Sequence, residues 1–462
     1  MLEKIPPYVM EVNNKLIDNG FESFLVGGSV RDLLAGREIK DWDFTTNAPP
    51  QDLLKLFPDA FYDNAFGTVG VPYENLPQIE HKGIIQITTF RTETGYIDRR
   101  HPESVEWGKT IEEDLSRRDF TINAIALKLS TLNSQLSTDI IDPYHGQEDI
   151  KNKIIRAVRD PNLRFKEDAL RLMRAIRFAT QLAFTIELHT LQAIIKDAPL
   201  LSEISKERVR DEFMKILSSD YPYEGVMLLK NTNLLQYILP ELLEGIGVSQ
   251  ERPGRHHKDD VFTHNVLSLK FCPSIDPIVR FAALIHDIGK PRVARSDEEG
   301  LVIFYNHEVM GAKMAREIAD RLRFPKKEKE KVSTLIRWHM FTVDEHITDS
   351  AVRRFIRRIG VENVQNMIDL RIGDRLGGGT QTAESWRLKL FKQRLEKELA
   401  PAAFSINDLA IDGRDIMKEL NIKPGPKVGQ ILQKLFEEVD EDLSKNTKEY
   451  LLKRIQEVSN RI

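Results

Sequence analysis

The sequence contains a single cysteine, Cys272, in a chain of 462 residues. One cysteine excludes an intrachain disulfide and a zinc site built from several cysteines. The sequence also lacks an apolar run long enough to cross a membrane, and its first residues include acidic side chains but no apolar signal region. From these absences we expect a cytoplasmic protein with no membrane partner.

A strong net charge is missing as well, since the formal charge at pH 7 is −4. Charge is nevertheless uneven, because basic residues outnumber acidic ones in 151–215 and in 313–358. Phosphate backbones respond to such local basic surfaces, so the near-neutral total does not exclude RNA. With 41% hydrophobic and 30% charged residues, the chain is expected to be globular and to contain several domains.

The most informative stretch is 24–46, FLVGGSVRDLLAGREIKDWDFTT. Its apolar start predicts a strand, and the Gly-Gly turn at Gly28 permits a close approach of the backbone to a phosphate. Asp41 and Asp43 follow in a β-like context, where residues two apart point to one face. Two carboxylates there suit Mg²⁺ ions that carry a triphosphate. The alternative, a strand edge with solvated aspartates, is disfavoured by the glycine turn followed by Arg31.

A second polar motif, 112–124, contains Arg117, Arg118 and Asp119. Guanidinium groups suit phosphate oxygens, and a carboxylate suits ribose hydroxyls. The alternative is a charged cap before an apolar helix over 122–127. The neighbouring glycine turn and aspartate pair favour the nucleotide-binding interpretation.

A strong helix is predicted over 165–179, with polar residues at every third position: Asp168, Arg171, Arg174 and Arg177. This spacing makes a polar stripe that winds slowly around a helix. A solvated face with ion pairs is one interpretation. The predominance of arginine over lysine favours recognition of a planar ligand instead.

A third group of residues lies further along the chain. His264 and the pair His286-Asp287 fall in helical segments, and His307, His339 and Asp374 follow. Imidazoles and carboxylates in this order can bind one or two divalent metals that activate water. The alternative is a scaffold in which this metal chemistry is idle.

Residues 24–46, 112–124, 142–149, 165–179 and 205–213 together resemble motifs A to E of the class II tRNA nucleotidyltransferases, which comprise the CCA-adding enzymes and their poly(A) polymerase relatives. The histidine and aspartate group resembles the HD phosphohydrolase superfamily. The resemblance covers nearly the whole chain. It implies that Asp41 and Asp43 are catalytic and hold Mg²⁺, while Gly28 and Arg31 bind the triphosphate.

The resemblance also implies roles for the other motifs. Arg117, Arg118 and Asp119 would contact the sugar and phosphates of the nucleotide. Asp168 and Arg171 would read the base edge of CTP or ATP in place of a nucleic-acid template, and Arg174 and Arg177 would hold phosphates. A second divalent metal would be held by His264, His286, Asp287 and Asp374.

Two further segments are interpreted by resemblance. Residues 91–107 are polar and aperiodic and are expected to form the flexible loop used in switching from CTP to ATP; Arg91, Tyr96, Arg99, Arg100, Pro102 and Val105 match the family pattern there. Residues 423–429 present a turn and a helix start suited to an RNA phosphate. A surface loop and a plain connector are the respective alternatives.

The expected fold class is α+β: a polymerase β-like nucleotidyltransferase head with a mixed sheet, followed by an all-helical neck, HD body and tail. The predicted boundaries are 1–155 for the head, 156–250 for a neck that binds the nucleotide base and RNA, 251–378 for the HD domain and 379–462 for a tRNA-binding tail. The expected reaction is template-independent addition of C, C and A to the tRNA 3′ end from CTP and ATP, with Mg²⁺ as cofactor.

Three alternatives remain open at this point. A poly(A) polymerase shares the head motifs, although residues 1–23 lack the basic element which that branch usually carries. A partial enzyme would add only CC or only A. An HD metal-dependent phosphohydrolase could use the head for RNA binding alone, which the intact Asp41 and Asp43 argue against.

Overall fold

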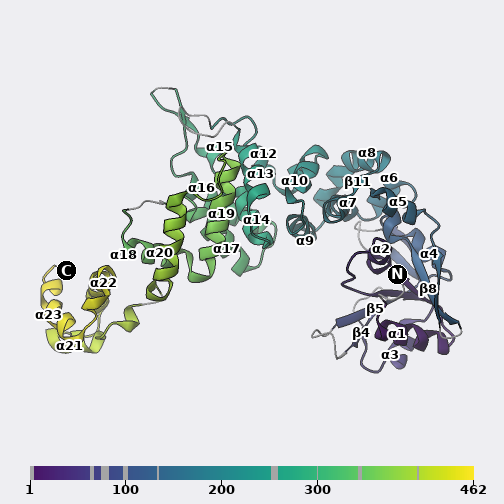
Figure 1. Cartoon of the computed structure of the whole chain (residues 1–462), viewed down its shortest axis with the longest axis horizontal. Helices are drawn as coiled ribbons and strands as arrows, with labels where there is room; N and C mark the ends of the chain where they lie inside the picture. Colours follow the sequence, from purple (N-terminus) through teal and green to yellow (C-terminus); the bar gives the residue numbers. More distant parts are fainter. Residues whose placement is uncertain are drawn as a thin grey trace. The chain divides into compact units, whose positions relative to one another are not determined.

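The structure is a computed structural model, and it describes residues 5–62, 67–73, 83–96, 102–132, 135–250, 259–298, 300–341, 346–402 and 405–461. The chain divides into two compact units, Met1–Pro240 and Glu241–Ile462, and Figure 1 colours the first from purple to teal and the second from green to yellow. Among the described residues, no helix is both long and apolar enough to cross a membrane. The sequence predicts four domains, a finer division than these two units, and the boundaries between those domains stay predictions.

The first unit is built on a seven-stranded mixed sheet of order β3-β4-β5-β2-β1-β8-β9. Within this sheet β2 and β5 pair in parallel, and the remaining neighbouring strands pair antiparallel. This confirms the predicted mixed sheet. Its strands are β1 (Ser23–Val26), β2 (Asp43–Thr46), β3 (Phe61–Tyr62), β4 (Thr68–Tyr73), β5 (Gly83–Thr89), β8 (Ala126–Leu132) and β9 (Gln135–Ile141).

The central strand β1 is buried along its whole length, as its apolar sequence predicts. Leu25 pairs with Phe44 on one side and with Leu127 on the other. Phe24 and Val26 pack with Phe90 and other apolar side chains. Because β1 and β2 are antiparallel, the turn after β1 lies beside the start of β2, which brings the glycines next to Asp43.

Helices surround this sheet and continue beyond it to residue 240. They are α1 (Pro7–Asp18), α2 (Gly28–Leu34), α3 (Pro50–Leu56), α4 (Ile111–Ser116), α5 (Gly146–Asn152), α6 (Pro161–Glu167), α7 (Leu170–Leu182), α8 (Leu188–Asp197), α9 (Lys206–Leu217), α10 (Pro222–Asn231) and α11 (Leu235–Ile238). The segment at 142–149 leads from β9 into the first turn of α5. Gly146 is required there because a Cβ would lie 2.2 Å from the carbonyl oxygen of Thr121.

The prediction of an aperiodic loop at 91–107 is wrong in one respect. The chain forms two strands, β6 (Arg91–Tyr96) and β7 (Pro102–Trp107), which pair antiparallel in a sheet of their own. Arg91 stands opposite Trp107 in the register, and Tyr96 opposite Pro102. Arg99 and Arg100 lie outside the described residues. The apolar run at 122–127 does not form the single helix of the alternative interpretation, because a short 3-10 turn covers Thr121–Asn123 and β8 begins at Ala126.

The prediction of a single helix over 165–179 is also wrong, because α6 ends at Glu167 and α7 begins at Leu170. Asp168 has an extended backbone, with φ −139° and ψ 102°. Its Oδ1 accepts a hydrogen bond from the backbone nitrogen of Leu170 at 3.1 Å. A carboxylate that satisfies an amide in the first turn of α7 stabilises this break.

The second unit is helical apart from the short pair β12 (Arg295–Ser296) and β13 (Val302–Ile303). The helices are α12 (Pro240–Leu243), α13 (Val261–Phe271), α14 (Pro277–Ile285), α15 (Lys290–Val293), α16 (His307–Arg321), α17 (Lys326–Trp338), α18 (Asp349–Ile359), α19 (Val364–Gly377) and α20 (Trp386–Ala402). The close packing of α19 on α13 requires glycine, because a Cβ at Gly373 would lie 2.5 Å from the carbonyl oxygen of Ser268.

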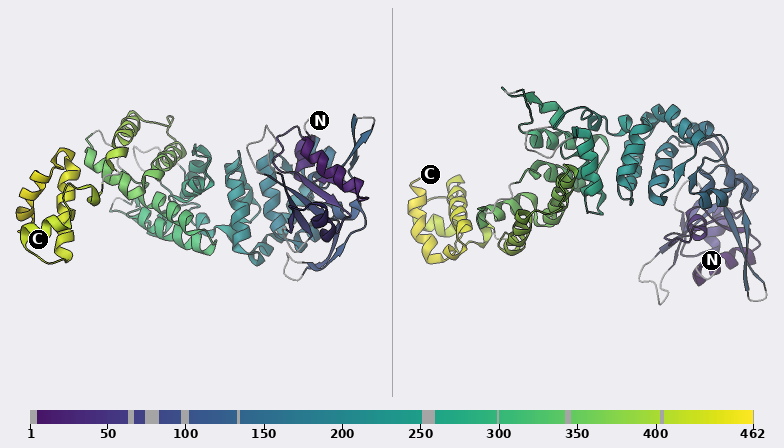
Figure 2. Two further views of the ribbon diagram at one scale, coloured as in Figure 1. Left: turned by 90° about the horizontal axis from the view of Figure 1, so that it is seen from below. Right: turned by 45° about the horizontal axis from the view of Figure 1, so that its top comes forward.

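The end of the chain forms a small bundle of α21 (Gly413–Leu420), α22 (Pro426–Glu441) and α23 (Lys448–Ser459), shown in yellow in Figure 2. Buried ion pairs link this bundle to the preceding helices. The buried Arg353 on α18 pairs with Glu398 on α20 and, at 2.9 Å, with Asp440 on α22. Removing one member of such a buried network costs on the order of 3–5 kcal/mol, so the network ties these helices together.

Candidate active site

The turn that follows β1 requires glycine for two reasons. Gly27 has φ +71°, a conformation that side chains rarely adopt. A Cβ at this position would also lie 3.1 Å from Nη1 of Arg118 and 3.5 Å from Oδ2 of Asp43. The turn therefore keeps the backbone close to a guanidinium and a carboxylate that come from distant parts of the sequence.

The two aspartates of this region do not share a strand. Asp43 is the first residue of β2, whereas Asp41 precedes the strand and is exposed. Both nevertheless line one cavity of about 480 Å³, together with Gly28 and Arg31. The structure thus brings the pair together, although not through the strand alternation that the sequence predicts.

Asp43 lies in an environment that disfavours its negative charge. Burial raises the pKa of its carboxyl to about 6, and the charge of Asp41 adds to the rise. Arg118 and Arg31 oppose the shift and do not cancel it. A cation bound between the two aspartates would relieve this cost, so the oxygen donors present here fit a hard divalent ion.

A continuous chain of polar contacts joins the glycine turn to α7. Arg31 donates to Oδ1 of Asn123 at 2.9 Å, and the amide of Asn123 donates to Oδ1 of Asp119 at 3.1 Å. The Nε of Arg174 donates to the other oxygen of Asp119 at 2.8 Å. Burial alone would raise the pKa of Asp119, but Arg174 and Asn123 hold it well below its ordinary value.

Arg117 and Arg118 are held by a residue to which the sequence analysis gave no role. Asp114 is fully buried and accepts from Nε of Arg117 at 3.0 Å and from Nη2 of Arg118 at 3.0 Å. Burial would raise the pKa of Asp114, but the two guanidiniums lower it. Asp114 and Asn123 both lie within the motif at 112–124, so their place in the motif is the signal that could have identified them.

The residues expected to read the base occupy different elements. Asp168 follows α6, while Arg171 lies on α7 and is buried, donating to Oε2 of Glu167 at 2.7 Å and to the backbone oxygen of Arg117 at 3.0 Å. Oδ2 of Asp168 accepts from Arg208 on α9 at 2.8 Å. Arg208 lies within the 205–213 motif, for which no contact with Asp168 is predicted from the sequence.

Three guanidiniums gather around one aromatic ring. Phe178 on α7 has Arg177 at 4.3 Å, Arg31 at 5.3 Å and Arg174 at 5.4 Å from its centroid. Burial and the charge of Arg174 lower the pKa of Arg177 to about 10, although Glu212 lies 3.0 Å away. The crowding of like charges favours an anionic ligand here.

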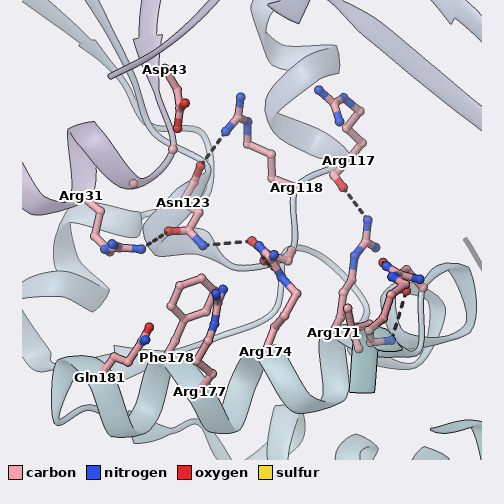
Figure 3. Close-up of a pocket in the computed structure, with 16 residues that line it drawn as sticks. Arg31, Asp43, Arg117, Arg118, Asn123, Arg171, Arg174, Arg177, Phe178 and Gln181 are labelled. Carbon is pink, nitrogen blue, oxygen red and sulfur yellow. Dashed lines mark hydrogen bonds and ion pairs between the residues drawn. The ribbon is translucent and has the colours of Figure 1, made fainter. Parts of the chain in front are cut away.

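These residues line one cavity of about 510 Å³, whose walls carry seven arginines and three aspartates. The surplus of positive charge matches the charge of a nucleoside triphosphate. Figure 3 shows side chains of α7 facing those of the glycine turn and the 112–124 motif across it. The cavity contains Asp43 and all nine residues expected to bind nucleotide: Gly28, Arg31, Arg117, Arg118, Asp119, Asp168, Arg171, Arg174 and Arg177.

The second unit holds the other expected cluster. His264 on α13, His286 at the end of α14 and Asp374 on α19 converge, with Nε2 of His264 lying 3.2 Å from Nε2 of His286 and 3.3 Å from Oδ1 of Asp374. Oδ2 of Asp287 lies 3.4 Å from His264 and 3.3 Å from His286. Ligand atoms around a tetrahedral ion with bonds of 2.0–2.1 Å are about 3.3 Å apart, so these spacings fit a metal.

Two further histidines, named in the sequence analysis but not assigned to the metal, face the same carboxylate. Oδ1 of Asp287 lies 3.2 Å from Nε2 of His307 and 3.5 Å from Nε2 of His339. Nδ1 of His286, His307 and His339 lies 2.7–2.9 Å from a backbone carbonyl oxygen. A proton on each Nδ1 leaves the Nε2 lone pair free for a metal.

A mixed sheet whose glycine turn and aspartates border an arginine-lined cavity defines a nucleotidyltransferase head, and family models agree. Residues 23–156 match the poly A polymerase head domain. Residues 183–245 match the probable RNA and SrmB-binding site of polymerase A, and 294–455 match the putative domain 2 of tRNA nucleotidyltransferases.

Curated relatives match along most of the chain. It is 33% identical to the A-adding tRNA nucleotidyltransferase of Deinococcus radiodurans, with 89% of this chain and 90% of that protein covered. It is 31% identical to the CCA-adding enzyme of Pediococcus pentosaceus over 96% of each chain. The CCA-adding enzyme of Geobacillus thermodenitrificans is 43% identical over 52% of this chain and 56% of its own length.

Among solved structures, the Bacillus stearothermophilus CCA-adding enzyme in complex with CTP aligns with a TM-score of 0.74 and 27% identity, covering 99% of this chain and 98% of that one. The chain therefore belongs to the family of nucleotidyltransferases that comprises CCA-adding enzymes and poly(A) polymerases. Membership in this family implies dependence on a divalent metal, generally Mg²⁺.

Proposed function

We propose that this chain adds C, C and A to the 3′ end of tRNA, using CTP and ATP and releasing diphosphate without a template. The observation that carries the proposal is the cavity in the first unit, where seven arginines surround a space bordered by Asp43. CCA-adding and A-adding relatives that match nearly the whole chain support it.

In this proposal Asp41 and Asp43 would hold Mg²⁺, because they line one cavity beside the glycine turn, and a bound cation would offset the cost of burying the charge of Asp43. Bound Mg²⁺ lowers the pKa of the attacking 3′-hydroxyl and neutralises charge on the leaving diphosphate. Gly28 and Arg31 bind the triphosphate from one side. Gly27 lets the backbone approach, since any side chain there would meet Arg118.

The remaining arginines orient the nucleotide. Arg117 and Arg118, which Asp114 fixes in place, donate to phosphate oxygens, and so do Arg174 and Arg177 on the opposite wall. Asp119 accepts from the ribose. Guanidinium forks are suited to these contacts because they donate two parallel hydrogen bonds to an anion.

Asp168 and Arg171 select the base in this proposal. A carboxylate only accepts and a guanidinium only donates at neutral pH, which matches the exocyclic amine and ring nitrogen of cytosine and adenine. Uracil and guanine place a carbonyl where the amine would be. Arg208 holds the carboxylate of Asp168, so it keeps the accepting group in position.

The test is incorporation of labelled CTP and ATP into tRNA that lacks its 3′ CCA. Asp41→Ala and Asp43→Ala proteins should lose nucleotide addition, while tRNA binding should largely survive because the segment that matches an RNA-binding model, 183–245, does not include them. Arg316→Ala, which removes an exposed charge from α16 in the other unit, is the matched control and should behave as the wild type. Substantial turnover by either aspartate variant would remove these residues from the catalytic role.

A second candidate function is supported by the cluster in the second unit. We propose that His264, His286, Asp287 and Asp374 bind a divalent transition metal in an HD-type site, with His307 and His339 beside them. The Nε2 and carboxylate oxygens lie at the spacing of ligands around one ion. Mixed imidazole and carboxylate donors suit zinc, iron or nickel better than Mg²⁺.

Metal analysis of purified protein tests this assignment. The wild type should retain a transition metal, and a His286→Ala/Asp287→Ala double variant should lose it. Nucleotide addition should be nearly unaffected, because the head has its own carboxylates. Equal metal content in the two proteins would leave the cluster as a structural element.

A further inference from the structure

A pocket in the second unit combines aromatic rings with unpaired positive charge. It neighbours the histidine and aspartate cluster, because Arg371 lines both cavities. The pocket has a volume of about 430 Å³, within the usual range for ligand sites. Its walls come from the segment that follows α17, from α19 and from the start of α20. They are formed by Phe341, Arg371, Arg375, Ser385, Trp386, Arg387 and Leu388.

The pocket carries positive charge that the described residues do not neutralise. No aspartate or glutamate is among its lining residues. Arg371 is paired with Asp374 at 3.1 Å, which leaves Arg375 and Arg387 as the charged groups without a carboxylate partner in the described part of the chain. The buried Nε of Arg375 also has no hydrogen-bond acceptor. Such a pair of guanidiniums is suited to a phosphate.

The aromatic side of the pocket is open. Trp386 is 58% exposed at the first turn of α20, an unusual exposure for so large an apolar ring. The guanidinium of Arg387 lies 5.3 Å from its centroid. Phe341, by contrast, packs against Phe355 and Phe391 and is fixed. An exposed indole beside an arginine is a surface on which a nucleobase stacks.

We infer that this pocket binds one unstacked nucleotide of the tRNA substrate, with its base against Trp386 and its phosphates against Arg375 and Arg387. The inference rests on the proposed function for the identity of the RNA. A peptide with acidic side chains would satisfy the guanidiniums but would leave the indole without a stacking partner. Stacking tolerates any base, so the pocket recognises an RNA segment rather than a sequence.

Binding of fluorescently labelled tRNA tests the inference, using Trp386→Ala and Arg387→Ala proteins. Both residues are exposed, so neither substitution endangers folding. Loss of the stack should weaken binding about tenfold. Loss of Arg387 should flatten the plot of log affinity against log salt by roughly 0.7 if it contacts one phosphate. Arg295→Ala removes the same charge from an exposed site on β12, outside the two basic segments, and should leave both quantities unchanged.

The outcomes separate this inference from the proposed function. If the wild type adds CCA to tRNA but the two variants bind tRNA with wild-type affinity and salt dependence, only the pocket assignment fails. If the wild type adds no nucleotide to tRNA, the proposed function fails first. A third measurement is titration of the wild-type and Trp386→Ala proteins with free AMP and CMP. If Trp386→Ala loses a binding site for the free nucleotide but binds tRNA as the wild type does, the assignment of the pocket to RNA is overturned.

Discussion

At the scale of single residues, the cavity of the first unit is organised by buried carboxylates that hold arginines in place. Asp114 fixes Arg117 and Arg118, and Asp119 joins Arg174 to Asn123. Each carboxylate remains ionised because its partners outweigh the cost of burial. The arginines are thereby oriented before any nucleotide arrives, which lowers the entropic cost of binding.

Sequence motifs could predict most of these residues, because each motif carries its polar groups within a few positions. Arg208 could not be predicted in this way. It stands 40 residues after Asp168 and meets it only because α9 packs against α7. A tertiary contact of this kind leaves no local pattern in the sequence.

Substitution of Asp168 tests whether this residue selects the base. A carboxylate oxygen that faces the carbonyl of uracil gains no hydrogen bond from the base, and this loss costs on the order of 1–3 kcal/mol, which corresponds to roughly 5- to 150-fold in rate. Asp168→Ala should therefore slow addition of C and A and relax the rejection of UTP and GTP. Incorporation of each of the four nucleotides separately by Asp168→Ala, Arg171→Ala and wild-type proteins is the measurement.

The comparison between nucleotides is what decides the role of these residues. If both variants lose rate equally for all four nucleotides and keep the preference for C and A, Asp168 and Arg171 serve structure or phosphate binding. Base selection would then belong to other residues of the cavity.

At the scale of elements, the mixed sheet and most helices could be predicted, because apolar runs and glycine turns mark their ends. Two features could not be predicted, a hairpin and a helix break. The strands β6 and β7 pair only with each other, and a hairpin outside the main sheet does not need the alternation that identifies a strand. The break between α6 and α7 falls among good helix formers and depends on one side-chain contact, from Asp168 to Leu170.

The hairpin of β6 and β7 allows a prediction about the choice of nucleotide. Replacing residues 94–104 with Asn-Gly preserves the pairing of Glu93 with Val105 and removes the outer part. If this segment takes part in the switch from CTP to ATP, C addition should persist and A addition should fall. The measurement is the rate of each addition on tRNA ending before the first C and on tRNA ending in CC. A parallel fall of both rates would identify the hairpin as a structural connection.

At the scale of the whole molecule, the chain has two units with separate chemistry. The first has the arginine-lined cavity, and the second has the histidine and aspartate cluster and the Trp386 pocket. The sequence predicted the order of these parts, because each cluster lies within one segment of the chain. The Trp386 pocket was not predicted, since its residues are divided between the segment after α17, α19 and the start of α20 and match no motif.

The relatives that cover nearly the whole chain include an A-adding and a CCA-adding enzyme, so similarity alone leaves the number of nucleotides added undecided. In our account one cavity with a single base-reading pair accepts both cytosine and adenine, so we expect the complete reaction.

Sequencing of the 3′ ends is the direct test. The wild-type protein is incubated with tRNA that ends before the first C, together with CTP, ATP and Mg²⁺, and the products are sequenced. Our account predicts that the products end in CCA and that extension stops there. Products ending in CC, products formed only from tRNA that already ends in CC, or long adenosine tails would contradict it.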